Sequence, residues 1–166
     1  MKTIICDASP LIFLAKLDLL HLISEALEGK VMVLECVRDE VCSESAGDVE
    51  MIRLRRFFDQ VEIVDFRNAA FPSVTLSESD RSTLNWAIEN RSDWLVADER
   101  LLRRVASEHG IPVVGLFGIL IQAMRKGIAT KEETRSAVNE VVSVHECRIS
   151  VSLYQRILEE IDHWNP

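Results

Sequence analysis

Two aspartates in this sequence each close a short apolar run. Asp7 ends the run TIICD, and Asp98 ends the run WLVAD. Open parallel sheets carry their ligand crevices at the carboxyl ends of their strands, so we expect both carboxylates at one edge of a sheet. Carboxylates gathered in this way favour hard divalent cations such as Mg²⁺ or Mn²⁺. The two runs therefore predict a metal site.

Two further acidic residues are candidates for the same site. Glu40 lies in the helical stretch 36–43, about 60° around the helix from Val37, so it borders the buried face. Asp80 lies at the start of a helix whose apolar positions include Leu84. Asp80 is therefore expected at a helix start and Glu40 at the border of a buried helix face. Asp7 and Asp98 are expected at strand ends.

Each of these acidic residues also has an ordinary structural interpretation. Ser77 and Asp80 fit the S-x-x-D capping box, in which the acid only complements the start of a helix. Asp98 could cap the helix that follows it, and Asp7 could accept backbone hydrogen bonds in the adjacent turn. Glu40 could be an ordinary flank residue. Considered singly, each acid leaves both interpretations open.

The reaction that needs such a cluster is metal-assisted hydrolysis of a phosphodiester bond. Two divalent ions about 4 Å apart can activate a water molecule, orient the phosphate and stabilise the departing oxygen. No histidine or cysteine is then required. The histidines share no metal-ligand spacing and follow no nucleophile motif; they are His21, His109, His145 and His163.

The elements that must position these acids alternate along the chain. Short β-like runs are separated by segments with helical periodicity, which indicates an α/β protein with three α/β/α layers around a mostly parallel sheet. The predicted strands are Thr3–Cys6, Val31–Leu34, Val61–Val64, Trp94–Ala97 and Pro112–Val114. Ser9 is expected to cap a helix whose first turn holds Pro10. Gly29 and Gly110 are expected to end helices, and residues 67–76 to form a loop.

Further helices are expected after the last strand, at Leu116–Lys126, Lys131–Val142 and Leu153–Ile161. With 166 residues, of which 48% are hydrophobic, the chain is expected to form a single domain. Its core would span about residues 1–126, with a helical extension at about 127–166. The apolar stripe of the last helix is expected to pack on this core or on a second subunit or partner.

Composition limits the possible partners and surroundings. The net charge of −8 opposes broad attraction to nucleic acid, so a polyanionic substrate would need metal ions or a local basic patch. Without a charged leader or a long apolar span, we expect a soluble, cytoplasmic protein that does not enter a membrane. The cysteines form no CxxC pair and are expected to be reduced; they are Cys6, Cys36, Cys42 and Cys147.

The order of these motifs resembles the PIN-domain family, in its branch related to VapC-type toxins. The motifs are DASPLIFLAK at residues 7–16, V-x-x-E-V at 37–41, L-S-x-S-D at 76–80 and V-A-D-E-R at 96–100. The resemblance implies that Asp7, Glu40, Asp80 and Asp98 bind Mg²⁺ or Mn²⁺ and are the catalytic residues of a ribonuclease. It also implies an auxiliary role for Ser9, which we extend to Glu99.

The same resemblance implies an RNA substrate, a homodimer and, for toxin members, an antitoxin protein as partner. Many relatives carry Glu where this chain has Asp80, which is one methylene shorter and would reach a metal less directly. The main alternative is a non-catalytic PIN-fold module that binds RNA or a protein. A nucleotide-binding or phosphotransfer protein is disfavoured, because the chain lacks G-x-G-x-x-G and G-x-x-x-x-G-K-[ST].

A stripe of arginines follows Asp98. Arg100, Arg103 and Arg104 lie at helical spacing and are candidates for binding RNA phosphates or an acidic antitoxin segment. A solvated outer helix face is the alternative, because any amphipathic helix has one.

Overall fold

A parallel β-sheet forms the centre of this computed structural model, which describes residues 1–44 and 47–166. Its strands are ordered β3-β2-β1-β4-β5. Their bounds are β1 (Lys2–Cys6), β2 (Gly29–Leu34), β3 (Glu62–Val64), β4 (Trp94–Val96) and β5 (Val113–Val114). In the central strand, Ile4, Ile5 and Cys6 are fully buried, as expected for a strand covered on both faces. The predicted α/β class and the predicted strands are confirmed.

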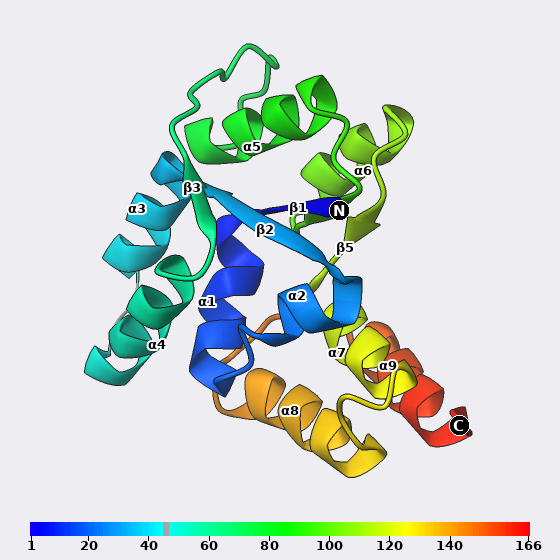
Figure 1. Cartoon of the computed structure of the whole chain (residues 1–166). Coiled ribbons are helices and arrows are strands. Elements are labelled where there is room, and N and C mark those ends of the chain that lie inside the picture. The colour runs from blue at the N-terminus through cyan, green and yellow to red at the C-terminus, as the bar shows by residue number, and fades with distance from the viewer. Residues whose placement is uncertain (45–46) are drawn as a thin grey trace.

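Helices cover both faces of this sheet. Their bounds are α1 (Ala8–Leu17), α2 (Leu22–Leu27), α3 (Glu35–Glu44), α4 (Asp48–Phe58), α5 (Glu78–Glu89), α6 (Arg100–Glu108), α7 (Leu116–Arg125), α8 (Lys131–Ser143) and α9 (Val151–His163). Helices α5 and α6 lie on one face, whereas α1, α2 and α7 lie on the other (Figure 1). The three predicted layers are therefore present.

Successive strands are added to the sheet first on one side of β1 and then on the other, while all strands stay parallel. From β1 the chain moves to β2 and then to β3 on one side, and later returns to place β4 and β5 on the other side. The register pairs Cys6 with Val96, so these two neighbouring strands end at the same level. Such a switch point is where open α/β sheets bind their ligands.

Two predicted helix boundaries are wrong by one or two residues. Helix α1 begins at Ala8 with Asp7 in the extended N-cap position, so Ser9 lies inside the first turn and is not the cap. Glu28 ends α2 in a left-handed conformation with φ of 55°, and Gly29 already belongs to β2. Gly110 does follow α6 at φ of 75°, as predicted, and residues 67–76 form no helix or strand.

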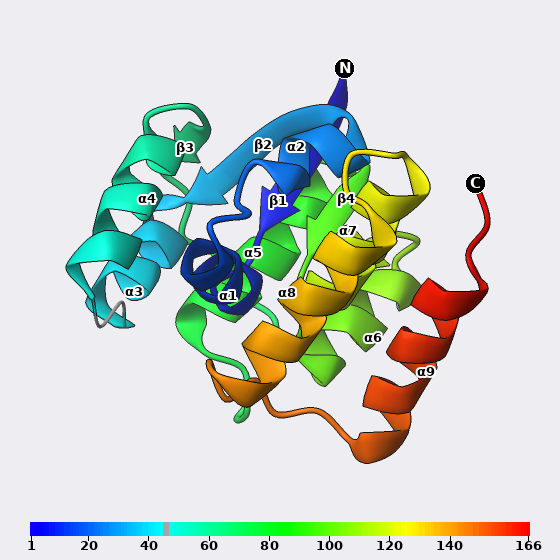
Figure 2. The same cartoon turned by 90° about the horizontal axis from the view of Figure 1, so that it is seen from below.

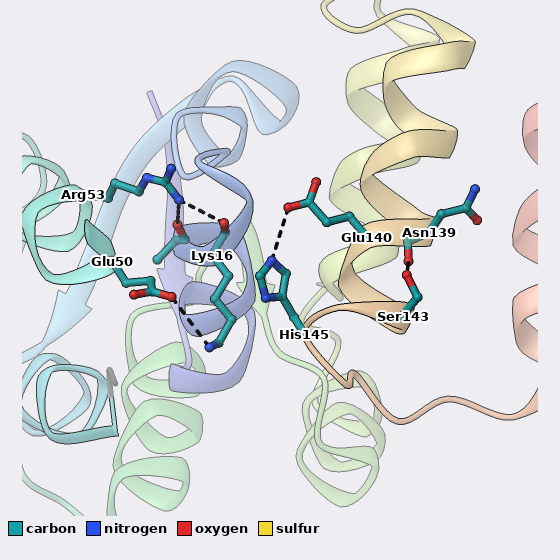
Figure 3. A network of polar contacts seen from close by, with 8 residues as sticks. Lys16, Glu50, Arg53, Asn139, Glu140, Ser143 and His145 are labelled. Atoms are coloured by element: carbon teal, nitrogen blue, oxygen red, sulfur yellow. Dashed lines mark hydrogen bonds and ion pairs between the residues drawn. The ribbon is translucent and has the colours of Figure 1, made fainter. Parts of the chain in front are cut away.

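Helix α4 is attached to the end of α1 by polar contacts (Figure 3). The Arg53 Nη1 atom donates to the carbonyl oxygens of Ala15 at 3.0 Å and Lys16 at 2.9 Å, which lie in the last turn of α1. The Lys16 Nζ and Glu50 Oε1 atoms lie 3.9 Å apart beside them. Arg53 thus satisfies carbonyl groups that a helix end leaves without partners.

The C-terminal helices pack outside this framework. Helix α8 packs against α1 and α7, and α9 packs against α8 through the buried Ile157 and Ile161. Figure 2 shows the segment that joins α8 to α9 running along the lower edge of the molecule. No helix in the described ranges is both long enough and apolar enough to cross a membrane.

Candidate active site

The sheet places Asp7 and Asp98 side by side at the switch point. The Asp7 backbone N–H donates to the Val96 carbonyl at 2.9 Å, so pairing with β4 continues one residue beyond β1. The Ala97 N–H donates in the same way to Val114 at 2.9 Å, immediately before Asp98. Two acidic residues that are 91 positions apart in the sequence therefore leave adjacent strands at one edge.

Asp7 is the most constrained of the candidate residues. Its side chain caps no backbone N–H of α1, and the residue is only 2% exposed. Within the described residues, its Oδ1 atom is buried without a hydrogen-bond partner. Burial raises the pKa of Asp7 well above its usual value, and the nearby Asp80 and Glu40 carboxylates raise it further. A backbone hydrogen bond from Ala8 opposes this shift, but the Oδ1 atom has no such bond and requires a proton or a cation.

Glu40 projects from α3 toward the start of α5. The hydroxyl of Ser79 donates to Glu40 Oε2. Burial raises the pKa of Glu40, the Ser79 hydrogen bond opposes this effect, and the Asp80 carboxylate adds to it. Ser79 belongs to the predicted L-S-x-S-D motif at 76–80, but it was not named there as a residue of the site. The one signal available was the run of small polar residues before α5.

Asp80 makes the capping box that its motif predicts. Its Oδ2 atom accepts from the Ser77 N–H at 3.0 Å, and the Ser77 hydroxyl accepts from the Asp80 N–H at 3.1 Å. The capping role and the site role are compatible, because the same carboxylate also lines the pocket that contains Asp7. One capping bond leaves a carboxylate with further acceptor positions.

Asp98 caps a different helix from the one expected. Its Oδ1 atom accepts from the backbone N–H of Leu116, the first residue of α7, at 3.0 Å. Helix α6 is instead capped by Glu99, whose Oε2 atom accepts from the Leu102 N–H at 2.7 Å. Burial raises the pKa of Asp98, whereas the Leu116 hydrogen bond and the Arg103 guanidinium oppose this shift.

All the predicted acids of the site line one pocket of about 490 Å³. Asp7, Glu40, Asp80 and Asp98 are joined there by the two auxiliary residues Ser9 and Glu99, and by Glu44. Glu44 was not predicted; it lies one helical turn after Glu40 and raises the pKa of that residue. The pocket thus contains carboxylates from α3 and α5 and from the residues that follow β1 and β4.

The pocket has the donor chemistry of a Mg²⁺ or Mn²⁺ site, but the donors do not yet converge. Carboxylate oxygens are the ligands that these cations prefer, and the unpartnered Asp7 oxygen fits such a role. In the described ranges, no three Asp, Glu, His or Cys side chains are positioned to hold a metal ion. Glu40 accepts a hydrogen bond from Ser79 and Asp98 accepts one from the Leu116 N–H, and each carboxylate keeps further acceptor positions.

The backbone beside Asp98 leaves no room for a side chain. A Cβ atom at Gly115 would overlap Asp98 Oδ1 and the Nη1 atom of Arg103. Arg103 also donates from Nη1 to the Ala97 carbonyl at 3.1 Å. Gly115 therefore permits the Asp98 carboxylate to reach the start of α7, a requirement that the sequence did not reveal.

The predicted arginine stripe divides into two parts. Arg100 and Arg103 line a second cavity of about 1070 Å³, which shares Ser9, Phe13 and Asp98 with the acidic pocket. Arg104 lines neither cavity, and its Nε atom lies 3.6 Å from Glu108 Oε1 on the exposed face of α6. The solvated-face interpretation therefore fits Arg104.

Comparisons with known proteins agree with this geometry. A family profile described as DUF3368: PIN domain matches residues 3–163. A PilT N-terminus domain protein from the hyperthermophilic archaeon Sulfolobus solfataricus has a similar structure, with a TM-score of 0.51 and 13% sequence identity over 70% of this chain and 89% of that chain. At this identity the likeness concerns the fold alone. Among curated proteins, no significant sequence match was found. Because the family profile spans nearly the whole chain, this protein belongs to the PIN-domain family.

Proposed function

We propose that the protein is a metal-dependent endoribonuclease in which Asp7, Glu40, Asp80 and Asp98 hold Mg²⁺ or Mn²⁺. PIN domains are typically metal-dependent nucleases. The observation that carries the proposal is the buried, unpartnered Oδ1 atom of Asp7, in a pocket that also contains the other three carboxylates. An ionised carboxylate buried in this way among like charges is unfavourable unless a proton or a cation neutralises it, and a divalent cation can neutralise several of these acids at once.

The chemistry divides between the ions and the protein. Bound divalent ions supply positive charge opposite the phosphate and lower the pKa of an attacking water. Asp7 is fixed by the end of β1 and the start of α1, so its carboxylate is the rigid anchor of the site. Ser79 orients Glu40, and the Leu116 N–H orients Asp98. These protein contacts reduce the entropy that is lost when the ligands converge on a cation.

The direct test is cleavage of total RNA with Mn²⁺, followed by mapping of the new ends. The wild-type protein should cleave, EDTA should stop cleavage, and Asp7→Asn should lower the rate about 100-fold or more, because an essential negative ligand is lost. Asp39→Asn is the matched control: Asp39 is adjacent to Glu40 but faces solvent, with its Oδ1 atom 2.9 Å from Arg38. Cleavage by Asp7→Asn at the wild-type rate would contradict the proposal.

A non-catalytic PIN-fold module is the second candidate. It is favoured by the protein partners of three of the acids, because Glu40 contacts Ser79, Asp80 caps α5 and Asp98 caps α7. Such a module could bind RNA or a protein without cleaving either. It would gain no stability from Mn²⁺, whereas the metal-dependent enzyme would.

The toxin role belongs to the same proposal. From the resemblance to toxin-related PIN proteins, we expect a homodimer and an antitoxin protein as partner. Light scattering should give twice the chain mass of 18.9 kDa, and co-expression with the product of the neighbouring gene should yield a complex. A monomer that co-purifies with no such product would exclude both partners.

A further inference from the structure

The larger cavity has a wall formed by the C-terminal part of the chain. It is bounded on one side by β5 and α7, and on the other by the α8–α9 segment (residues 144–150) and α9. In Figure 2 this segment runs from α8 to α9, and α9 lies beside α7, to which Glu160 is hydrogen-bonded through Arg125. Since Ser9, Phe13 and Asp98 line both spaces, the cavity continues directly from the acidic pocket.

This wall is a fixed part of the fold. At the start of the α8–α9 segment, the His145 Nε2 atom lies 3.3 Å from Glu140 Oε1, as Figure 3 shows. The Cys147 N–H then donates to the Val141 carbonyl at 3.0 Å. At the other end, Glu160 of α9 accepts from Arg125 of α7 at 2.6 Å. These contacts hold the α8–α9 segment to α8 and hold α9 to α7.

The cavity concentrates arginines in a protein whose net charge is −8. Arg100, Arg103, Arg125 and Arg148 line it, together with the acidic Asp98, Glu146 and Glu160. Over residues 1–44 and 47–166, Arg100 and Arg148 have no ion-pair partner, whereas Arg125 is paired with Glu160. Unpaired guanidinium groups bind phosphate oxygens with two parallel hydrogen bonds.

Apolar side chains line the same cavity as these arginines. Phe13, Trp94 and Phe117 line the same cavity, and Leu153 contributes from α9. Aromatic and aliphatic surfaces beside cationic groups suit unstacked bases and their phosphates. A duplex keeps its bases stacked inside, away from such side chains, whereas a single strand can place its bases against them.

We propose that this cavity binds the single-stranded part of the RNA adjacent to the cleaved bond, with Arg148 of the α8–α9 segment as a phosphate-binding residue. The inference rests on the proposed ribonuclease function and adds the C-terminal extension to its substrate site. Arg100 lies two residues after Asp98 at the start of α6, whereas Arg148 lines the same cavity from the α8–α9 segment, so the cavity has cationic groups from both parts of the chain. A strand held by both walls would present its phosphodiester bond to the acidic pocket.

The test is binding of a fluorescein-labelled single-stranded RNA of about ten nucleotides, a length in the range that single-strand grooves accommodate. All proteins carry Asp7→Asn, so the RNA stays intact and binding is measured independently of cleavage. Fluorescence anisotropy should show that Arg148→Ala raises Kd about ten-fold, as loss of a charged hydrogen bond predicts. Arg148→Lys should retain part of the affinity.

Arg156→Ala is the matched control, because Arg156 is an exposed arginine on α9 that does not line the cavity. It should leave Kd unchanged, and the same RNA annealed to its complement should bind more weakly than the single strand. Equal effects of Arg148→Ala and Arg156→Ala, or equal binding of duplex RNA, would overturn the inference. So would an Arg148-dependent affinity for an acidic peptide but not for RNA. A protein that cleaves RNA yet shows these results would retain the proposed function.

Discussion

At the scale of single residues, Asp7 occupies a position that is unfavourable for an ionised carboxylate. Its carboxylate is almost fully buried, has one unpartnered oxygen and lies near Asp80 and Glu40. A stable core would place an amide or an apolar group there, because an unpaired buried charge costs free energy. Such local costs are typical of residues retained for binding or catalysis.

Asp7→Asn should therefore stabilise the metal-free protein. At a pH high enough to ionise Asp7 in the folded protein, we expect the free energy of unfolding in EDTA to rise by about 1–2 kcal/mol, because the buried charge is removed and the residue keeps its shape. Urea unfolding measures this change. A loss of stability would show that the carboxylate makes favourable contacts in the metal-free protein.

The pH dependence follows from the same carboxylate. Folding raises the pKa of Asp7, so the folded protein binds the proton more tightly than the unfolded chain does. The stability that results is present below the ordinary pKa of an aspartate and is lost as pH rises through the raised value. Between pH 4 and pH 8 in EDTA, unfolding free energy should fall more for wild type than for Asp7→Asn. Parallel curves would contradict the burial of this charge.

Ser79 offers a test of positioning at the same scale. Its hydroxyl hydrogen bond lowers the pKa of Glu40, so Ser79→Ala should raise that pKa and shift the acidic limb of the activity profile to higher pH. A readout of kcat against pH separates this effect from simple destabilisation. Ser73→Ala, in the exposed loop before α5, is the control and should leave the limb in place. If the acidic limb of the kcat profile does not shift in Ser79→Ala, Ser79 does not position Glu40.

At the scale of elements, the strand order brings the acids together. The carboxyl ends of β1 and β4 are adjacent only because the chain crosses between them, and this places Asp7 beside Asp98. The strands themselves could be predicted, because β-branched apolar runs bounded by turn residues favour buried strands. Helix starts were harder, since Asp7 and Ser9 are both good cap residues by type and only the backbone decides between them.

The turn from β5 into α7 depends on Gly115. Gly115→Ala should displace Asp98 or Arg103, because a Cβ atom would overlap both side chains. We expect a loss of RNA cleavage of about ten-fold or more, as misplacement near reacting groups predicts. Gly110→Ala is the control: at φ of 75° with open space around it, it should cost about 1 kcal/mol of stability and leave cleavage intact. Equal cleavage by both variants would contradict the role of Gly115.

At the scale of the whole molecule, the C-terminal helices complete the space beside the acidic pocket. Helix α9 could be predicted from its apolar stripe, whose members Ile157 and Ile161 are buried. Its position against α7 could not, because it depends on contacts such as Arg125 with Glu160, 35 residues apart. The same limit applies to Arg148 and Ser79, whose neighbours in the fold are distant in the sequence. The order of the motifs predicted which acidic residues form the pocket. The residues around them could be identified only from the three-dimensional structure.

The measurement that tests the central claim most directly is the melting temperature of the whole protein with increasing Mn²⁺. If the acidic pocket binds the ion, saturation at about 100 times Kd adds about 2.7 kcal/mol, which raises Tm by several degrees for a chain of this size. Asp39→Asn should show the wild-type rise, and Asp7→Asn with Asp98→Asn should abolish it. No rise in wild type, or an equal rise in the double variant, would contradict the assignment of this pocket as a metal site.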